Sequence, residues 1–196
     1  RCRFCRSGRD SLCADRQFMG KSFADKMLCA ADHLTRIEGD VPDEQIIAVP
    51  TSFGTAWHML FTRGRLAVGE TVLINSVGSG IGSAAVQLAK LAGARVIGTA
   101  STDEKLARAA DLGMDVGINY TRQDVVAEVM AATRGLGVDL TYEHVGGELF
   151  QRGLDALGFD GRLVTCGAHA GEVVDFDIIP FFRNQLAVIG SYGYTK

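Results

Sequence analysis

Apolar and polar positions follow different patterns on the two sides of residue 50. From Thr71 onward, short apolar runs rich in β-branched residues alternate with amphipathic stretches, at intervals of about 20 to 25 residues. Strands that alternate with helices in this way predict a parallel sheet with helices packed on its faces. Six runs have the length of strands: Thr71–Asn75, Arg95–Thr99, Val116–Asn119, Val138–Glu143, Arg162–Cys166 and Leu186–Gly190.

The stretches between these runs carry helix signals. Apolar residues recur at helical spacing within Ile81–Leu91, and Ser101–Glu104 predicts a capping box for a second helix that stops at Gly113. Two more helices are expected at about Asp124–Thr133 and Glu148–Leu157. We therefore predict an α/β fold, a doubly wound parallel six-stranded sheet of the Rossmann type, with its ligand site at the carboxyl edge.

The pattern is different upstream of Pro50. Three cysteines stand near the start of the chain, and two strand-like pieces follow at Lys26–Cys29 and Leu34–Ile37. We predict a domain boundary near Pro50, which separates residues 1–50 from a dinucleotide-binding domain at residues 51–196, with Ser52–Thr62 as a connecting helix. Since the chain begins inside a cysteine motif and ends directly after an apolar run, we expect the intact protein to continue on both sides.

A glycine-rich turn joins the first predicted strand to the first predicted helix. Its residues are Gly78, Ser79, Gly80, Ile81 and Gly82. In this position, small residues let the backbone approach a pyrophosphate, and the helix start offers unpaired N–H groups. The strict G-x-G-x-x-G spacing is not met, because the two earlier glycine positions hold Val77 and Ser79. A turn without a ligand is the alternative, but the six surrounding strands favour a dinucleotide site.

In such folds, the residue at the end of the second strand determines whether NAD or NADP is preferred. Ala100 stands there, in place of a carboxylate that would bind the ribose hydroxyl and repel a 2′-phosphate. Ser101, Lys105 and, after the third strand, Tyr120 can donate hydrogen bonds to a phosphate. We predict NADP as the preferred cofactor, with NAD as the alternative, since Ser and Lys are also ordinary residues at a helix start.

Composition limits the classes of function. Of the 196 residues, 47% are hydrophobic and 22% are charged, which is typical of a soluble globular protein. No apolar run approaches the roughly 18 residues of a membrane span, and a net charge of −3 disfavours binding to nucleic acid. Three of the five cysteines cluster at the start, and the α/β remainder has only Cys29 and Cys166. This distribution favours a metal site over disulfides, in a reducing, cytoplasmic compartment.

Several motifs resemble those of the medium-chain dehydrogenase/reductase superfamily, in its zinc-binding alcohol dehydrogenase and quinone oxidoreductase-like branches. They cover the chain nearly end to end: Cys2-x2-Cys5-x7-Cys13, Thr55–Trp57, Gly69–Ile74, Gly78–Gly82, Ile118–Tyr120, Glu143–Gly146 and Gly161–Gly167. The resemblance implies that residues 1–50 are the last part of a GroES-like β domain with a structural-zinc lobe. In this lobe Cys2, Cys5, Cys13 and one cysteine upstream would hold the zinc, with free thiols or a redox cluster as the alternative.

The same resemblance implies further contacts. The nicotinamide would be contacted by the connecting helix and by residues that follow the fourth, fifth and sixth strands: Thr55, His144, Val145, Cys166, Gly167, Ala168, Ile189, Gly190 and Ser191. It also implies a homodimer or homotetramer in which the last strand pairs with its twin, since an apolar edge strand left open is prone to aggregate.

The position of one catalytic-zinc ligand in this family holds Thr51, whose neutral hydroxyl is a poor ligand. We therefore expect an NAD(P)H-dependent oxidoreductase that transfers hydride between nicotinamide and a small carbonyl, quinone or enone substrate. A zinc-dependent alcohol dehydrogenase and a non-catalytic nucleotide-binding scaffold are the alternatives. No catalytic side chain is assigned. His144 could be a catalytic acid or base, but a histidine at such a strand end more often lines the adenosine side or packs as a neutral ring, and His33 and His58 have the surroundings of packed or half-exposed residues.

Overall fold

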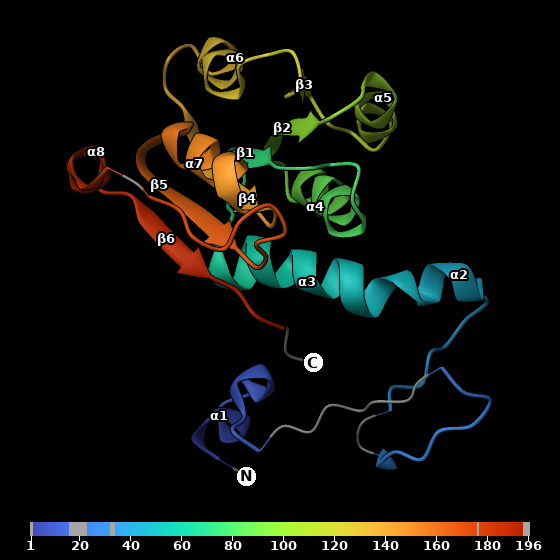
Figure 1. Ribbon diagram of the computed structural model, residues 1–196. Helices are drawn as coiled ribbons and strands as arrows, with labels where there is room; N and C mark the ends of the chain where they lie inside the picture. The colour runs from blue at the N-terminus through green and yellow to red at the C-terminus, as the bar shows by residue number, and fades with distance from the viewer. Residues whose placement is uncertain (1, 16–22, 32–33, 176, 194–196) are drawn as a thin grey trace.

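The computed structural model describes residues 2–15, 23–31, 34–175 and 177–193 (Figure 1). Six strands form one sheet in the order β3-β2-β1-β4-β5-β6, and every neighbouring pair is parallel. The chain begins the sheet at the central strand β1, adds β2 and β3 on one side of it, and then adds β4, β5 and β6 on the other. The predicted doubly wound fold is therefore confirmed. The strands are β1 Thr71–Ile74, β2 Arg95–Ala100, β3 Val116–Asn119, β4 Val138–Glu143, β5 Leu157–Thr165 and β6 Ala187–Gly190.

Helices cover both faces of the sheet. One buried cluster joins Val72 and Ile74 of β1 to the connecting helix, α4 (Gly80–Leu91) and α5 (Asp103–Asp111). The other joins Leu73 to α6 (Val125–Ala132) and α7 (Gly147–Asp155). Successive side chains of a strand point to opposite faces, so a continuous apolar run supplies both cores.

Side-chain caps begin α4, α5 and α6, with one correction to the expectation. The predicted capping box at Ser101–Glu104 is wrong, because the residue that caps α5 is Thr102. Its hydroxyl accepts a hydrogen bond from the Lys105 N–H at 3.4 Å. Lys105 thus takes the third helical position, where a capping box needs Glu or Gln.

The fifth strand begins earlier than predicted. α7 ends at Asp155, and β5 already starts at Leu157 rather than at Arg162. A Cβ at Gly137 would stand 2.5 Å from the Gly158 nitrogen, so two facing glycines let the starts of β4 and β5 approach closely. A short helix before β6, α8 (Ile178–Arg183), was not indicated by the apolar pattern.

A helical rod leads to the sheet and contains the predicted connecting helix. It passes through α2 (Asp43–Ile46), wider turns at Val49–Phe53, α3 (Gly54–Trp57) and further wide turns at His58–Arg63 (Figure 1). Helical turns thus continue through Pro50, which stands in the first turn of its segment, where proline is tolerated. The division into residues 1–50 and 51–196 stays a prediction.

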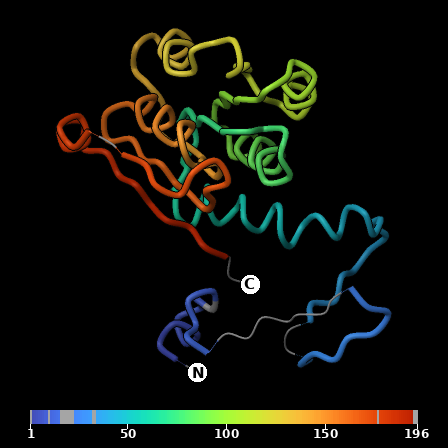
Figure 2. Tube along the Cα trace, in the orientation of Figure 1, coloured from blue at the N-terminus to red at the C-terminus, as the bar shows by residue number. Residues whose placement is uncertain are grey.

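The described residues before this rod form little regular structure. α1 (Arg3–Arg6) and a single turn at Asp10–Leu12 are followed by the blue trace that Figure 2 shows on one side of the sheet. The predicted strands at Lys26–Cys29 and Leu34–Ile37 are wrong. A strand needs a hydrogen-bonded neighbour, and these two pieces find none within the described part of the chain. The tail of a β domain at residues 1–50 is therefore still only a prediction.

Candidate functional site

Two cavities lie at the carboxyl edge of the sheet. The small cavity, of 180 Å³, lies beside the ends of β1, β2 and β3, and the large cavity, of 820 Å³, lies beside the ends of β5 and β6. The winding of the chain reverses between β1 and β4, and ligands of doubly wound sheets bind at this reversal. The two cavities lie on either side of this reversal, at the edge of the sheet where the topology predicts a ligand.

The turn after β1 depends on close backbone contacts. Ser79 caps α4, because its hydroxyl accepts a hydrogen bond from the Gly82 N–H at 3.0 Å. A Cβ at Gly82 would overlap the Ser76 carbonyl oxygen, and a Cβ at Gly78 would stand 2.8 Å from the Lys105 side chain. The glycines thus keep a cradle open in front of the unpaired N–H groups at the start of α4.

The small cavity brings five of the predicted residues together. Its walls are formed by Gly78, Ser79, Ser101, Lys105 and Tyr120, along with Ser76 and Ala100. The Lys105 ammonium lies 3.4 Å from the Ser101 hydroxyl, as expected for residues one helical turn apart. Because Ala100 ends β2, no acidic side chain is among the residues that line this cavity.

One carboxylate near the small cavity is engaged elsewhere. Asp103 accepts hydrogen bonds from Asn119 at 3.0 Å and from Arg122 at 2.6 Å. The hydrogen bond from Asn119, followed by that from Arg122, lowers the pKa of Asp103. The negative charge beside Ser101 and Lys105 is therefore largely compensated.

His144 joins the glycine turn to the fourth strand. Its Nε2 lies 3.0 Å from the Ser79 hydroxyl, whereas its Nδ1 is buried and has no hydrogen-bond partner in the described chain. Burial lowers the pKa of His144 to about 4, and the nearby His169 contributes further. The ring is therefore neutral near pH 7.

Glu143 is a fully buried carboxylate at the end of β4 that sequence reasoning did not single out. One oxygen accepts hydrogen bonds from the Val145 and Gly146 N–H groups at 2.6 and 2.8 Å, and the other accepts one from the Thr165 hydroxyl at 2.9 Å. This side chain thus helps to fix the loops after β4 and β5 to each other. A carboxylate within a strand-end motif was the only signal in the sequence.

The large cavity contains a second group of predicted residues. Its walls include Cys166, Gly167 and Ala168 after β5, and Gly190 and Ser191 at the end of β6. Burial, with a smaller effect of Glu143, raises the pKa of Cys166 to about 11, so this residue is a thiol at neutral pH.

Basic side chains from distant segments complete the large cavity. Arg9 comes from the N-terminal segment, and His58 and Arg63 come from the connecting helix. His58 is buried, as expected, but its Nδ1 lies 2.9 Å from the Ser191 hydroxyl, so it is part of the cavity wall. Burial and the charge of Arg63 lower the pKa of His58. Sequence reasoning missed this role because the partner is 133 residues away.

Some predicted residues line neither cavity. Thr55 is half-buried on α3, and Ile189 is half-buried within β6. Val145 lies in the loop that Glu143 holds. Gly80, Ile81 and Gly82 form the first turn of α4, where a Cβ at Gly80 would stand 3.2 Å from the Ser52 hydroxyl. They support the carboxyl edge, and their contact with a cofactor stays a prediction.

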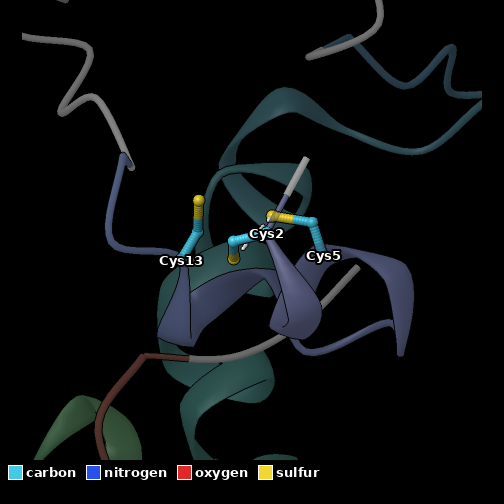
Figure 3. Close-up of side chains that lie close together, drawn as sticks. All are labelled: Cys2, Cys5 and Cys13. Carbon is cyan, nitrogen blue, oxygen red and sulfur yellow. Dashed lines mark hydrogen bonds between the residues drawn. The ribbon is translucent and has the colours of Figure 1, made fainter.

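The three N-terminal cysteines form a possible metal centre. Their sulfurs all lie within 4.8 Å of one another, and those of Cys2 and Cys5 are 3.7 Å apart (Figure 3). Four sulfurs around a tetrahedral zinc, each about 2.3 Å from it, are themselves roughly 3.8 Å apart. The spacing of these thiols therefore fits three corners of a zinc site.

Potential metal ligands were also sought in the rest of the described chain. Cys2, Cys5 and Cys13 are the only group of three potential ligands among the described residues, and Thr51 is exposed. His33 lies outside the described residues.

Comparison with known proteins identifies the family. The model of the zinc-binding dehydrogenase family matches residues 80–196, more than half of the chain. The chain belongs to this family. A quinone oxidoreductase-like protein 2 homolog of Nematostella vectensis is 30% identical over 174 residues, which are 88% of this chain and 47% of that protein. This member of the family thus spans about half the length of that relative.

Solved structures give the same result. The structure of AibC is 34% identical, with a TM-score of 0.92, and this chain covers 60% of it. An NAD-dependent alcohol dehydrogenase is 33% identical, with a TM-score of 0.86 and 58% of its chain covered. Mycobacterial Rv1454c, solved with NADPH, is 29% identical over 80% of this chain and 48% of its own, with a TM-score of 0.73. These neighbours place the chain among medium-chain dehydrogenases and reductases.

Among the residues that the structure describes, no helix has both the length and the apolar content needed to cross a bilayer.

Proposed function

We propose that this chain is the dinucleotide-binding part of an NAD(P)H-dependent oxidoreductase that acts on a small carbonyl, quinone or enone substrate. The small cavity carries this proposal, because a glycine cradle, a helix start, four hydroxyl-bearing side chains and one lysine line it. The chemistry that a nicotinamide dinucleotide supplies is hydride transfer. The role of this chain is to bind the dinucleotide and to orient it along the carboxyl edge, with the large cavity beside β5 and β6 as the substrate side.

NADPH is the cofactor that we propose as preferred. Support comes from Lys105 and Ser101, which stand beside Ala100 without an acidic neighbour in the cavity wall. The comparisons point in both directions, since one neighbour is described as NAD-dependent and another was solved with NADPH. We therefore base the preference for NADPH on the residues that line the small cavity.

A titration of both dinucleotides tests this function. In the full-length protein we expect NADPH to bind more tightly than NADH. We expect Lys105→Ala to weaken NADPH by about ten- to a hundredfold, because a charge-assisted contact is lost, and to leave NADH nearly unchanged. Arg108→Ala is the matched control, since Arg108 is on the same helix but pairs with Glu104. Equal affinities in the wild type, or equal losses in the variant, would refute the phosphate pocket.

A zinc-dependent alcohol dehydrogenase is the second candidate, favoured by the cysteine cluster that is typical of that branch. Against it stands Thr51 at the position of a catalytic ligand. Activity that survives removal of loosely bound metal by a chelator would favour the first candidate. Loss of activity that added zinc restores would favour the second.

We also propose that Cys2, Cys5, Cys13 and one further cysteine hold a structural zinc. The spacing of the sulfurs supports this, and a closed tetrahedral site has no position for a substrate. Metal analysis of the full-length protein should find about one zinc per subunit. It should find much less in Cys5→Ser, with a less stable lobe but similar chemistry. A zinc content of less than about half an equivalent, unaffected by Cys5→Ser, would sink the idea.

We also propose that the protein forms a homo-oligomer and is cytoplasmic. β6 is the edge strand of the sheet and is largely exposed, which supports pairing with the same strand of a second copy. Light scattering that finds only monomer at high concentration would refute the pairing. None of the five cysteines forms a disulfide, which supports a reducing compartment that cell fractionation can test.

A further inference from the structure

The hydroxyl of Ser79 has two hydrogen-bonding neighbours inside the protein. The Gly82 N–H donates to its oxygen at 3.0 Å, and the Nε2 of His144 lies 3.0 Å from the same oxygen. A serine hydroxyl has one proton to donate and two lone pairs that accept. Whether its proton points toward His144 or away from it depends on which nitrogen of the histidine ring carries a proton.

The His144 ring has a single proton to place. The side chain is 6% exposed, and its low pKa means that the ring is neutral at physiological pH. A neutral imidazole carries its proton on either Nδ1 or Nε2. The ring is held edge-on by Tyr142, at 5.8 Å between ring centroids, and the Tyr142 hydroxyl donates to the Ile81 carbonyl in the first turn of α4.

The two tautomers leave different groups unpaired. With the proton on Nδ1, a buried N–H would have no acceptor, since Nδ1 contacts no partner in the described chain. With the proton on Nε2, the ring donates to Ser79 and leaves only an empty acceptor at Nδ1. Buried N–H groups without a partner are rarer in proteins than under-used acceptors, which favours the Nε2–H form.

We propose that His144 is a positioning residue that aims the Ser79 hydroxyl proton into the small cavity. As the Nε2–H tautomer, it occupies the second lone pair of Ser79, while the Gly82 N–H occupies the first. The hydroxyl can then act only as a donor, toward the space that it shares with Ser101 and Lys105. The matching ligand group is an anionic oxygen, which accepts but cannot donate. This inference rests on the proposed function, in which that oxygen belongs to a phosphate of the dinucleotide.

Nitrogen NMR of the histidine rings tests the tautomer without any ligand. In the full-length apoprotein, two-bond proton–nitrogen correlations distinguish a protonated from an unprotonated ring nitrogen. His144 is assigned by the signals that disappear in His144→Gln. We expect its Nε2 to be protonated and its Nδ1 to be bare, and the opposite pattern would overturn the inference.

Binding measurements test the orientation of the hydroxyl. His144→Gln retains an N–H donor near the position of Nε2, so NADPH affinity should stay within about threefold of the wild type. His144→Leu lets the hydroxyl rotate, and Ser79→Ala removes it, so each should weaken NADPH by about tenfold. Because His144 and Ser79 act through the same hydroxyl proton, the double variant of His144→Leu and Ser79→Ala should bind NADPH no worse than Ser79→Ala alone. His169→Gln, a nearby exposed histidine, is the control and should leave affinity unchanged.

The outcomes separate this inference from the proposed function. Wild-type protein that binds neither dinucleotide would overturn the proposed function and, with it, the ligand assigned to Ser79. Wild-type protein that binds NADPH while a folded His144→Leu binds it equally well would overturn the positioning role alone. A thermal melt of each variant shows whether it is folded, and His144→Gln keeps the test valid if the leucine variant is not.

Discussion

The two halves of the carboxyl edge are built in different ways. The small cavity beside β1, β2 and β3 takes its walls mainly from one glycine turn and one helix start, and the Ser79–Gly82 and Ser101–Lys105 contacts span only three and four residues. The wall of the large cavity depends on contacts between distant segments. His58 meets Ser191 across 133 residues, and Arg63 donates to the Gly190 carbonyl across 127.

The two cavities should therefore respond differently to substitutions. The small cavity depends on local backbone geometry, which a single side chain in the wrong place can destroy. The large cavity depends on the docking of the connecting helix against the last strand, so its shape varies with whatever weakens that contact. Four substitutions can test this comparison, and their expected effects decrease in the order given.

The largest effect should come from crowding the glycine turn. A Cβ at Gly82 would overlap the Ser76 carbonyl oxygen, whereas a Cβ at Gly190 would meet nothing within 4 Å. Gly82→Ala should lower the free energy of unfolding by about 2–3 kcal/mol, because the backbone must shift. Gly190→Ala should change it by less than about 0.5 kcal/mol. Chemical denaturation measures both, and equal losses would contradict the contrast between the two halves.

A smaller effect should follow from the ion pair that joins the two halves at the opposite edge of the sheet. Glu70 precedes β1 and accepts hydrogen bonds from Arg162 of β5 at 2.6 and 2.9 Å. Burial alone would raise the pKa of Glu70, but the Arg162 hydrogen bond and the Ala67 N–H outweigh it and lower the pKa below its ordinary value of 4.5. Glu70→Gln should cost about 1–2 kcal/mol at pH 7.

The same pair predicts a pH dependence. Because the pKa of Glu70 is lower in the folded state, its stabilisation is fully present above pH 4.5 and is lost as the pH falls through the lowered value. Glu70→Gln should therefore lose less stability than the wild type between pH 7 and the acid range. Glu104→Gln, which removes an exposed pair, is the control and should behave like the wild type. An unchanged acid response in Glu70→Gln would contradict this assignment.

The contact between His58 and Ser191 in the wall of the large cavity should stabilise the fold by about as much as one hydrogen bond. Ser191→Ala leaves the buried Nδ1 of His58 without its partner, which should cost about 1 kcal/mol. A double-mutant cycle with His58→Phe should give a coupling of similar size. A coupling close to zero would mean that another contact docks the connecting helix on β6.

The smallest effect should come from the edge of the small cavity. Arg122→Ala removes the cation that binds Asp103 and leaves more negative charge near Ser101 and Lys105. Since this pair is solvent-exposed, we expect only about a two- to threefold loss of NADPH affinity. NADH binding should stay the same. A gain in NADPH affinity would show that Arg122 does not shield the pocket.

Local signals predicted the fold and indicated which residues gather around the small cavity. Runs such as Val72-Leu73-Ile74 specify strands buried on both faces, and the spacing of Ser101 and Lys105 already placed both on one side of a helix start. These rules involve only neighbouring residues, so they can be applied to a sequence alone. The capping box failed because Ser101 and Thr102 can both cap a helix, and the extended backbone at residue 102 makes Thr102 the cap.

The remaining features depend on contacts that one sequence does not encode locally. The buried role of Glu143 needs the Val145 N–H and the Thr165 hydroxyl to meet it, and the role of His58 needs Ser191. The expected strands at Lys26–Cys29 and Leu34–Ile37 had suitable residues but no partner strand in the described chain. The early start of β5 depends on two facing glycines, Gly137 and Gly158.

The buried carboxylate of Glu143 also constrains motion. Its two oxygens are hydrogen-bonded to the loop after β4 on one side and to Thr165 at the end of β5 on the other. To displace either loop alone would break a hydrogen bond to a fully buried side chain. Backbone hydrogen bonds, such as that from the Ala170 N–H to the Val145 carbonyl, join the same two loops, so we expect them to move as one unit.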